Sequence, residues 1–316
     1  MGAKTDVKVV GSGSRTAQER TRADRDADPA RRAMAGSLYV VATPLGNLRD
    51  VTLRSLDVLA TASAIAAEDT RVTATLLRHY GIATPTLSLH AHNEAARVEM
   101  IVAMLEAGKS VALVSDAGTP AISDPGARLV RAVRDAGYPV IPLPGPSALA
   151  TAISAAGLDA ESFVFLGFLP QQAKARRARL AAFAELPVAI VVYEAPHRVR
   201  ATVADLAVAF GGERALVVGR ELTKAFETIT RIQLGGADAW FAGDTNRERG
   251  EFVLIVDAPA RAMRGANSAL SADAERWLAA LLAEMPPARA ARVVASVTGI
   301  KRDVVYARAL ELKSGN

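Results

Sequence analysis

The chain has 316 residues, of which half are hydrophobic, with 38 basic and 33 acidic side chains and no cysteine. This length suits two domains of ordinary size with a small appendage. The lack of cysteine excludes a disulfide framework, a thiolate nucleophile and a Cys-ligated zinc site, and no run of 18 apolar residues is present to span a membrane. We therefore expect a cytoplasmic protein without a structural metal.

Residues 1–36 are predicted to form a disordered basic extension. They are rich in arginine, aspartate, alanine, serine and glycine, and they have no sustained apolar period. The run Val9–Gly13 resembles a strand entering a dinucleotide-binding turn, but Thr16 stands where that pattern needs its last glycine, and no apolar helix follows. This run therefore does not predict a nucleotide site.

Residues 37–157 are predicted to form a first α/β domain, because short apolar runs alternate with helix-length segments. This alternation is typical of βαβ units in a mainly parallel sheet with helices on both faces. The expected strands are Leu38–Ala42, Ala64–Ala67, Leu87–Leu89, Val111–Ser115 and Val140–Leu143. The expected helices are Val51–Ala60, with Asp50 as its cap, Thr73–Tyr80, Asn93–Ala107, Gly126–Ala136 and Ser147–Ala156. The last of these helices is expected to bridge to a second domain.

Residues 158–258 are predicted to form that second α/β domain, around a mixed sheet. The expected strands are Phe163–Leu169, Ala189–Glu194, Leu216–Glu221, Glu227–Leu234 and Glu251–Val256, and the helices are Ala173–Glu185 and His197–Phe210. Residues 259–316 read as a linker and a small helical unit, with helices at Ala272–Glu284, Ala288–Val297 and Arg302–Leu312. The short turn between the last two is the size found in helix-turn-helix units.

The loops that follow the five strands of the first domain are the best candidates for a ligand site. Each is rich in glycine, proline or small polar residues, and the carboxyl ends of parallel strands meet at one edge of a sheet. The loops begin at Thr43, Glu68, His90, Ser115 and Pro144. No phosphate-binding loop is present, and acidic residues at the strand ends would repel phosphate while suiting a cationic or hydroxyl-rich ligand. S-adenosylmethionine has both properties.

Several of these segments carry a specific family resemblance. The segments are Thr43-Pro44-Leu45-Gly46-Asn47-Leu48, Ala67-Glu68-Asp69-Thr70-Arg71, Ser115-Asp116-Ala117-Gly118-Thr119-Pro120, Ile122-Ser123-Asp124-Pro125-Gly126, Pro144-Gly145-Pro146-Ser147, Gly167-Phe168-Leu169-Pro170, Tyr193-Glu194 with His197-Arg198, Arg220-Glu221-Leu222-Thr223-Lys224 and Gly250-Glu251. In this order they resemble the signatures of the ribosomal RNA small subunit methyltransferase I family. The likeness covers Leu38 to Val256, and the terminal helices resemble that family's helix-turn-helix-like tail.

The resemblance implies the tetrapyrrole-methylase fold, in which two α/β domains hold S-adenosylmethionine in the cleft between them and the chain forms a homodimer. It also implies 2'-O-methylation of a cytidine ribose in the decoding region of 16S rRNA, within the small ribosomal subunit. Tetrapyrrole methylases usually have a glycine-rich first loop that ends in an acid. The loop Thr43–Asn47 departs from that pattern, which fits the rRNA branch and disfavours a porphyrinoid substrate.

By position in these motifs, the resemblance implies a set of cofactor-binding residues: Pro44, Ser115, Asp116, Thr119, Ser147, Ala148, Glu194 and Leu222. Removing the proton of a ribose hydroxyl calls for a carboxylate or imidazole as base, in addition to good positioning. The candidates for this base are His90, His92, Glu94, Glu68 and Asp69. Glu68 or Asp69 is alternatively expected to form a buried ion pair with Arg71.

Positive charge gathers on the flanks of the chain. Residues 1–35 carry 8 basic and 5 acidic side chains, and residues 259–316 carry 9 and 5, whereas the central part is near neutral. Basic flanks favour a polyanionic partner, although solvated surface charge is the alternative. The residues expected to bind RNA phosphates are Arg71, Lys174, Arg176, Arg177, Arg179, Arg198, Lys224, Lys301 and Arg302.

Two other functions remain open from the sequence. One keeps the fold and the cofactor but replaces RNA with a small tetrapyrrole-like substrate. The other is a non-catalytic RNA-binding factor in ribosome assembly. The basic flanks favour RNA over a tetrapyrrole, and the intact loop motifs favour an enzyme over a silent binder.

Overall fold

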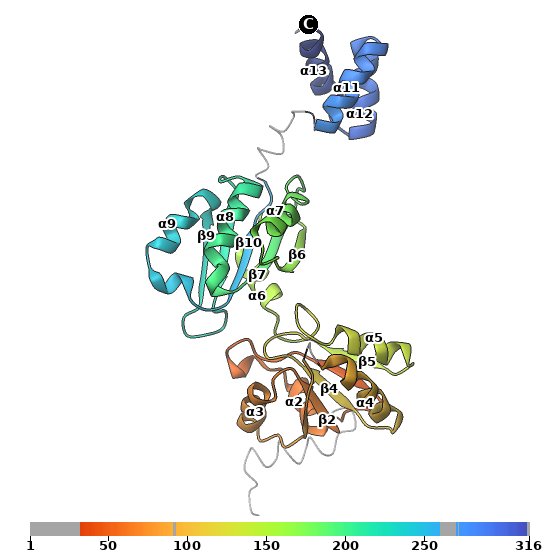
Figure 1. Ribbon diagram of the computed structural model, residues 1–316, viewed down its shortest axis with the longest axis vertical. Coiled ribbons are helices and arrows are strands. Elements are labelled where there is room, and N and C mark those ends of the chain that lie inside the picture. The colour runs from red at the N-terminus through yellow and green to blue at the C-terminus, as the bar shows by residue number, and fades with distance from the viewer. Residues whose placement is uncertain (1–31, 91–92, 260–269, 271, 315–316) are drawn as a thin grey trace, which may run out of the picture.

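The computed structural model describes residues 32–90, 93–259, 270 and 272–314. Two α/β lobes follow one another along the chain, and a three-helix unit comes last (Figure 1). Residues 1–31 of the predicted extension 1–36 therefore lie outside the described residues, and so does the run Val9–Gly13 within them. Most of the predicted linker also lies outside the described residues. Among the described residues, no helix is both long and apolar enough to cross a membrane.

The first lobe is built on a five-stranded sheet in the order β3-β2-β4-β1-β5, with all neighbours parallel. The strands are β1 (Leu38–Val41), β2 (Ala64–Ala67), β3 (Thr86–Ser88), β4 (Val111–Val114) and β5 (Val140–Leu143). Every residue of β2 and β4 is buried, because helices cover both faces of a parallel sheet. This confirms the predicted sheet type, and it brings the ends of all five strands to one edge.

Four helices cover the two faces of this sheet. They are α2 (Leu53–Thr61), α3 (Thr70–His79), α4 (Glu94–Glu106) and α5 (Ala127–Asp135). The first two pack in one hydrophobic cluster and the last two in another, on opposite faces. The N-cap of α2 is Thr52, whose hydroxyl accepts the backbone N–H of Ser55, and not the expected Asp50. Asp50 instead ends a short 3-10 helix, Leu48–Asp50.

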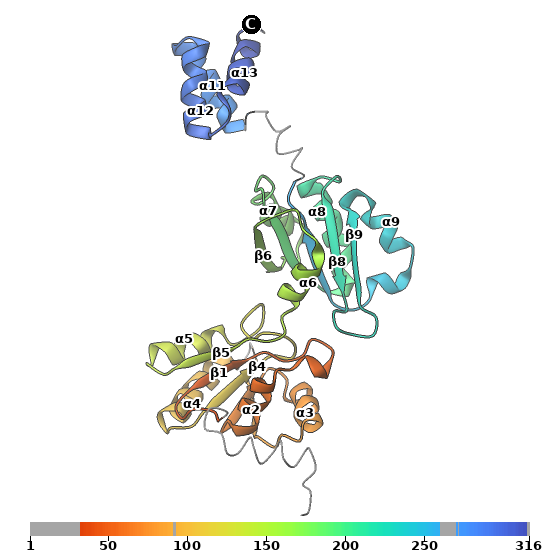
Figure 2. The same cartoon turned by 180° about the vertical axis from the view of Figure 1, so that it is seen from behind.

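The second lobe is built on a mixed sheet in the order β6-β7-β10-β8-β9, in which only β6 and β7 run parallel. The strands are β6 (Phe163–Phe168), β7 (Ala189–Glu194), β8 (Ala215–Arg220), β9 (Thr228–Gln233) and β10 (Phe252–Val256). One face is covered by α7 (Ala173–Ala181), α8 (Val199–Phe210) and α9 (Ala237–Ala242). Helix α6 (Ala148–Ala156) joins the lobes and packs against the other face. Figure 2 shows the same arrangement from behind.

The terminal unit consists of α11 (Ala272–Glu284), α12 (Pro287–Thr298) and α13 (Arg302–Ser314). These helices share a small hydrophobic core of their own, which includes Leu278, Val294 and Val305. Gly299 ends α12 in the left-handed conformation that a glycine adopts without strain. The three predicted helices are therefore present, with a turn of the predicted kind between the last two.

Candidate cofactor cleft

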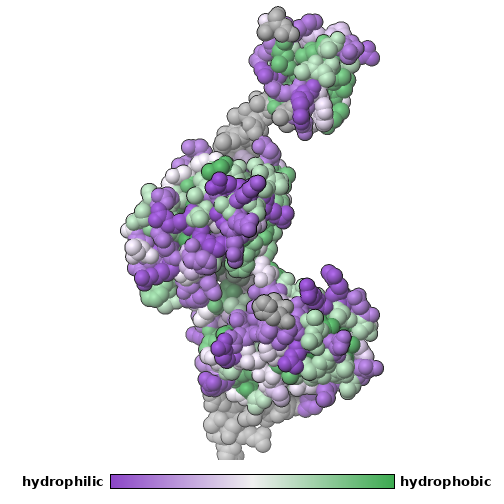
Figure 3. Space-filling view, viewed as in Figure 1, coloured by the Kyte–Doolittle hydropathy of each residue, from purple (hydrophilic) through white to green (hydrophobic). Residues whose placement is uncertain are grey.

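A cleft of about 440 Å³ lies between the two lobes, where loops of the first sheet meet the strand ends of the second. The space-filling view shows the narrow waist between the lobes on one face of the molecule (Figure 3). The walls of the cleft combine apolar side chains with a few acidic groups. The lining residues used below are Leu45, Glu68, Asp116, Gly118, Thr119, Ile122, Asp124, Ser147, Ala148, Phe168, Tyr193, Glu194 and Leu222.

The floor of the cleft is held in place by hydrogen bonds between loops of the first lobe. The backbones of Thr43 and Gly118 exchange two hydrogen bonds of 2.9 Å, and Gly118 has a φ of 80°, which glycine adopts without steric cost. The hydroxyl of Thr119 donates to the carbonyl of Pro146 at 2.9 Å. Three loops that are distant in sequence thereby form one rigid surface.

Three carboxylates gather at one end of the cleft: Glu68, Asp116 and Asp124. The Asp116 carboxylate accepts the backbone N–H of Asp69 at 2.9 Å, which links the ends of β2 and β4. Burial raises the pKa of Glu68, helped by the neighbouring Asp116 carboxylate. Burial and the Glu68 carboxylate raise the pKa of Asp124 to about 6. Partly buried like charges favour a cationic ligand, whose charge would relieve their repulsion.

Strained backbone is concentrated at this cleft. The non-glycine residues with positive φ in the described chain are Ala121, Ser123, Glu221 and Thr223. They belong to two loops that face each other from the two lobes, and each loop contributes lining residues, such as Ile122 and Leu222. Such conformations persist only where the surrounding structure enforces them, and they cluster at functional sites.

The lobes touch where two glycines leave room. A Cβ atom on Gly46 of the first lobe would lie 2.2 Å from Cγ of Lys224 in the second. A Cβ atom on Gly167 of β6 would lie 2.8 Å from the Ser123 hydroxyl oxygen. Gly167 has a φ of 64° and follows a register shift in the pairing of β6 with β7. The bulge allows this close approach and directs the next residue, Phe168, into the cleft.

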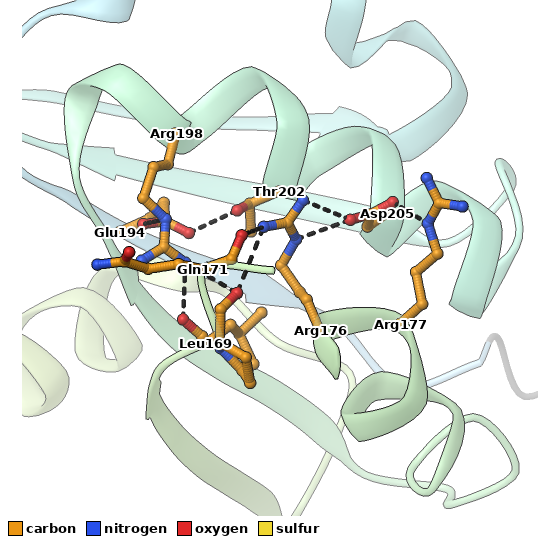
Figure 4. A network of polar contacts seen from close by, with 9 residues as sticks. Leu169, Gln171, Arg176, Arg177, Glu194, Arg198, Thr202 and Asp205 are labelled. Carbon is orange, nitrogen blue, oxygen red and sulfur yellow. Dashed lines mark hydrogen bonds and ion pairs between the residues drawn. The ribbon is translucent and has the colours of Figure 1, made fainter. Parts of the chain in front are cut away.

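A buried network fixes the turn that follows Phe168 (Figure 4). The Arg198 guanidinium donates to the carbonyl of Leu169 at 2.7 Å, and Arg176 donates to the carbonyl of Gln171 at 3.1 Å. Glu194 holds Arg198 and accepts a hydrogen bond from the Thr202 hydroxyl. Arg176 in turn pairs with the buried Asp205 at 2.6 Å.

Six of the eight residues expected to bind the cofactor line the cleft: Asp116, Thr119, Ser147, Ala148, Glu194 and Leu222. Pro44 and Ser115 do not. Ser115 is buried behind the floor, where its backbone carbonyl accepts the Thr43 hydroxyl at 3.0 Å. The Glu194 carboxylate is occupied by Arg198, Thr202 and the backbone of Ala195, so it shapes the wall through a fixed side chain.

The candidate bases separate clearly. Of the four candidates that the structure describes, Glu68 alone lines the cleft. Asp69 is the N-cap of α3 and pairs with Arg71 at 2.6 Å, which lowers its pKa to about 2. The pair is exposed, because the Arg71 side chain is 88% accessible, so the expectation of a buried ion pair is wrong. Glu94 is buried and accepts the N–H groups of Gly126, Arg128 and Leu129 at 3.1–3.3 Å.

Glu94 therefore caps the first turn of α5 and is removed as a candidate base, since carboxylates stabilise helix N-termini. His90 is half-buried at the start of the loop before α4 and is not among the lining residues. His92 lies outside the described residues.

The residues expected to bind RNA also divide. Arg176 is only 5% exposed and holds Asp205, which corrects its assignment to the RNA surface. Lys174, Arg177 and Arg179 of the same helix are exposed, as are Lys301 and Arg302. Arg198 is mostly buried and supports the Leu169 turn. Lys224 bridges Glu221 and Glu251 at 2.9 Å, and those two hydrogen bonds raise its pKa against the opposing effect of burial.

Sequence reasoning did not select three residues of the cleft wall, Asp124, Phe168 and Tyr193. Each lies inside one of the motifs quoted above, so the motifs did point to this part of the chain. The sequence did not reveal the bulge at Gly167 or the contact between the rings of Phe168 and Tyr193, whose centroids are 5.7 Å apart. The Tyr193 hydroxyl accepts the backbone N–H of Leu149 at 3.0 Å and so ties the second sheet to α6.

Comparison with known proteins agrees with this architecture. The family model described as tetrapyrrole (corrin/porphyrin) methylases matches residues 37–238, and that described as the RsmI C-terminal HTH domain matches residues 268–313. Ribosomal RNA small subunit methyltransferase I of Pseudomonas aeruginosa is 47% identical over 277 residues, which cover 88% of this chain and 98% of the relative.

Solved structures share the fold at low identity. The methyltransferase CobJ aligns with a TM-score of 0.55 and 20% identity, over 72% of this chain and 95% of that one. A uroporphyrin-III C-methyl transferase from Thermus thermophilus, solved in complex with S-adenyl homocysteine, aligns with a TM-score of 0.50 and 18% identity. The alignment covers 70% of this chain and 97% of that one. The fold likeness and the sequence relatives point the same way. The chain belongs to the ribosomal RNA small subunit methyltransferase I family and has the tetrapyrrole-methylase fold.

Proposed function

We propose that this protein transfers a methyl group from S-adenosylmethionine to the 2'-hydroxyl of a cytidine in 16S rRNA, in the decoding region of the small ribosomal subunit. The observation that carries the proposal is the cleft between the lobes, with its acidic end and apolar walls. The substrate class is supported by the names of relatives that match nearly their whole length. A ribosomal substrate also implies a cytoplasmic site of action.

The residues present fit this cofactor. A volume of about 440 Å³ is within the range of small-molecule sites. Glu68, Asp116 and Asp124 supply negative charge for a sulfonium and an ammonium, and Leu45 and Ile122 supply apolar surface for the adenosine. When bound, S-adenosylmethionine supplies an electrophilic methyl group. The acidic end disfavours a phosphate-bearing ligand in the same place.

The chain's own part in the reaction is positioning and proton removal. The rigid floor between Thr43 and Gly118 holds the reacting groups in line, which supplies much of the rate in such transfers. We assign Asp124 as the base: one of its carboxylate oxygens accepts the proton of the ribose hydroxyl. This group lies in the cleft and has a pKa of about 6, which makes it more basic than an ordinary aspartate while leaving it largely ionised at pH 7.

The proposal is tested by incubating the full chain with labelled S-adenosylmethionine and undermethylated small subunits, and then mapping the label. We expect one labelled cytidine ribose in the decoding region. Label on a base, or on another RNA, would overturn the proposed position. Transfer to a tetrapyrrole but not to subunits would overturn the substrate class, and cofactor binding without any transfer would favour the non-catalytic RNA-binding factor.

A further inference from the structure

Helix α5 carries a row of three arginines, Arg128, Arg131 and Arg134, which we call the α5 arginine row. All three are exposed. The opposite side of the helix contributes Leu129 and Val133, which are fully buried in the first lobe. A spacing of three residues places neighbouring members on one side of a helix. The nine-residue helix is thus divided into a core side and a cationic side.

The row lacks the acidic partners that some other surface arginines have. Within the described chain, none of the three side chains forms an ion pair or a hydrogen bond. By contrast, Arg71 pairs with Asp69, and Arg200 pairs with Asp238 and Glu248. Like charges at this spacing destabilise a helix. The row therefore adds nothing evident to folding, apart from the favourable position of Arg134 near the helix C-terminus.

The row starts at the rim of the cleft. Ile122 and Asp124 line the cleft, and α5 begins three residues after Asp124. From Arg128 to Arg134 the helix advances about 9 Å. Both ribbon views place α5 on the same side of the molecule as α7, which belongs to the other lobe (Figures 1 and 2). The exposed Lys174, Arg177 and Arg179 lie on α7, so the two lobes offer positive charge on one side of the cleft.

An RNA substrate needs such a surface outside the cleft. The carboxylates of Glu68, Asp116 and Asp124 repel phosphates, so the strand flanking the target nucleotide must be held at the rim. The planar guanidinium group binds phosphate oxygens in a two-pronged geometry and is always charged. We propose that the α5 arginine row binds backbone phosphates of the rRNA strand whose nucleotide enters the cleft. This inference rests on the proposed function, since it assigns part of the substrate contact.

The test compares two variants of the full chain that lose the same charge. One is R128Q/R131Q/R134Q, and the other is R54Q/R78Q/K109Q, whose exposed residues lie on α2, on α3 and in the loop before β4. Helices α2 and α3 cover the opposite face of the sheet. Glutamine keeps a helix propensity close to that of arginine, so α5 should remain folded. Circular dichroism and cofactor affinity verify the fold of each variant.

Binding to small subunits is measured across potassium chloride concentrations, and methylation is measured at varied subunit concentration. For the row variant we expect the slope of log K against log salt to fall by about 2, from three lost phosphate contacts. We also expect the KM for subunits to rise about 10-fold or more, with kcat and cofactor affinity within about 2-fold of the unaltered protein. The control should change each quantity by less than about 2-fold.

Equal losses in the two variants, or an unchanged slope in the row variant, would overturn the inference. The unaltered protein separates this result from failure of the proposed function. If it binds subunits with a salt-dependent affinity but transfers no methyl group, the proposed reaction fails while the slope comparison still decides the role of the row. If it binds no subunits, both proposals fail.

Discussion

Asp116 illustrates how one side chain serves the fold and the ligand. Its carboxylate orders the loop after β2 by accepting the N–H of Asp69, and it also faces the cleft. We expect Asp116→Ala to weaken S-adenosylmethionine binding by about 1–3 kcal/mol, because a hydrogen bond to a charged group is lost. Isothermal titration calorimetry measures this, with the exposed Asp135→Ala as the control. Full affinity in a folded Asp116→Ala protein would contradict the placement.

As the proposed base, Asp124 should give the reaction a pH dependence. Its pKa is raised from 3.8 to about 6, so the carboxylate becomes available as a base as pH rises through 6. A bound cation shifts this point downward. We expect the rate of methylation to rise with pH to a plateau, and this rising limb of the pH profile should lie at or below pH 6. Asp124→Asn should lose that limb and lower kcat about 10²- to 10⁴-fold. A limb that survives in Asp124→Asn would assign it to another group.

The same shift affects stability, with a defined sign. Between about pH 4 and 6 the folded protein holds the Asp124 proton and the unfolded chain does not. The free energy of unfolding therefore falls as pH rises through this window, by on the order of 1 kcal/mol once solvent screening is allowed for. Denaturant titrations of the unaltered protein and of Asp124→Asn at pH 4.5 and 7 measure the difference. An equal change in both proteins would show that Asp124 is not its source.

The candidate site could be located from the sequence more easily than its chemistry could be assigned. Loop composition at the strand ends predicted the cleft, and six residues expected from motifs line it. Glu94 was misassigned because its partner, the first turn of α5, lies 32 to 35 residues away in sequence. Asp124 was passed over because its basicity arises from burial and from Glu68, which sequence spacing does not reveal.

At the scale of elements, α7 and α8 are joined by two arginines that hold one carboxylate. Arg176 and Arg177 both contact Asp205 at 2.6 Å, but their side chains are 5% and 62% exposed. We expect Arg176→Met to lower the free energy of unfolding by about 3–5 kcal/mol, because it leaves a buried charge poorly compensated. Arg177→Met should cost about 0–1 kcal/mol. Urea unfolding of the two variants measures the contrast, and equal losses would refute the distinction drawn from burial.

Most strands and helices were predictable because apolar runs and capping residues act locally. The exceptions depend on tertiary contacts. Helix α9 is six residues long and is held by Phe241, which packs in the core of the second lobe. Thr52 rather than Asp50 caps α2, because residues 48–50 form a 3-10 turn first. Nothing local in the sequence distinguished Arg176 from its exposed neighbours, since its partner belongs to another helix.

At the scale of the whole molecule, the terminal helices have a core separate from those of the lobes. A chain ending at Pro259 should therefore fold and bind S-adenosylmethionine with unchanged affinity. We expect it to bind small subunits more weakly and with a flatter salt dependence, because Lys301 and Arg302 are exposed on the missing unit. Filter binding across salt concentrations measures this. Full binding and normal methylation by the shortened chain would show that the unit does not hold RNA.

We also propose that the chain forms a homodimer, as the family resemblance implies. Two exposed apolar side chains mark the edge strand β9: Ile229 lies on the strand, and Phe226 lies just before it. Both are suited to burial against a second copy of the chain. Light scattering at micromolar concentration should give twice the mass of the chain. A mass equal to one chain would exclude the dimer under those conditions.

The contacts at Gly46 and Gly167 bear on how damaging variants of this protein should be recognised. At both positions, a methyl group would meet an atom of the opposite lobe within 3 Å. Each lobe keeps its own hydrophobic core whatever the spacing between them. A substitution at Gly46 can therefore widen the cleft while both lobes remain folded, whereas one at Gly167 also strains β6, because its φ of 64° favours glycine. Screens that score abundance or melting temperature alone would class a Gly46 variant as harmless, and a ligand-binding assay would reveal the loss.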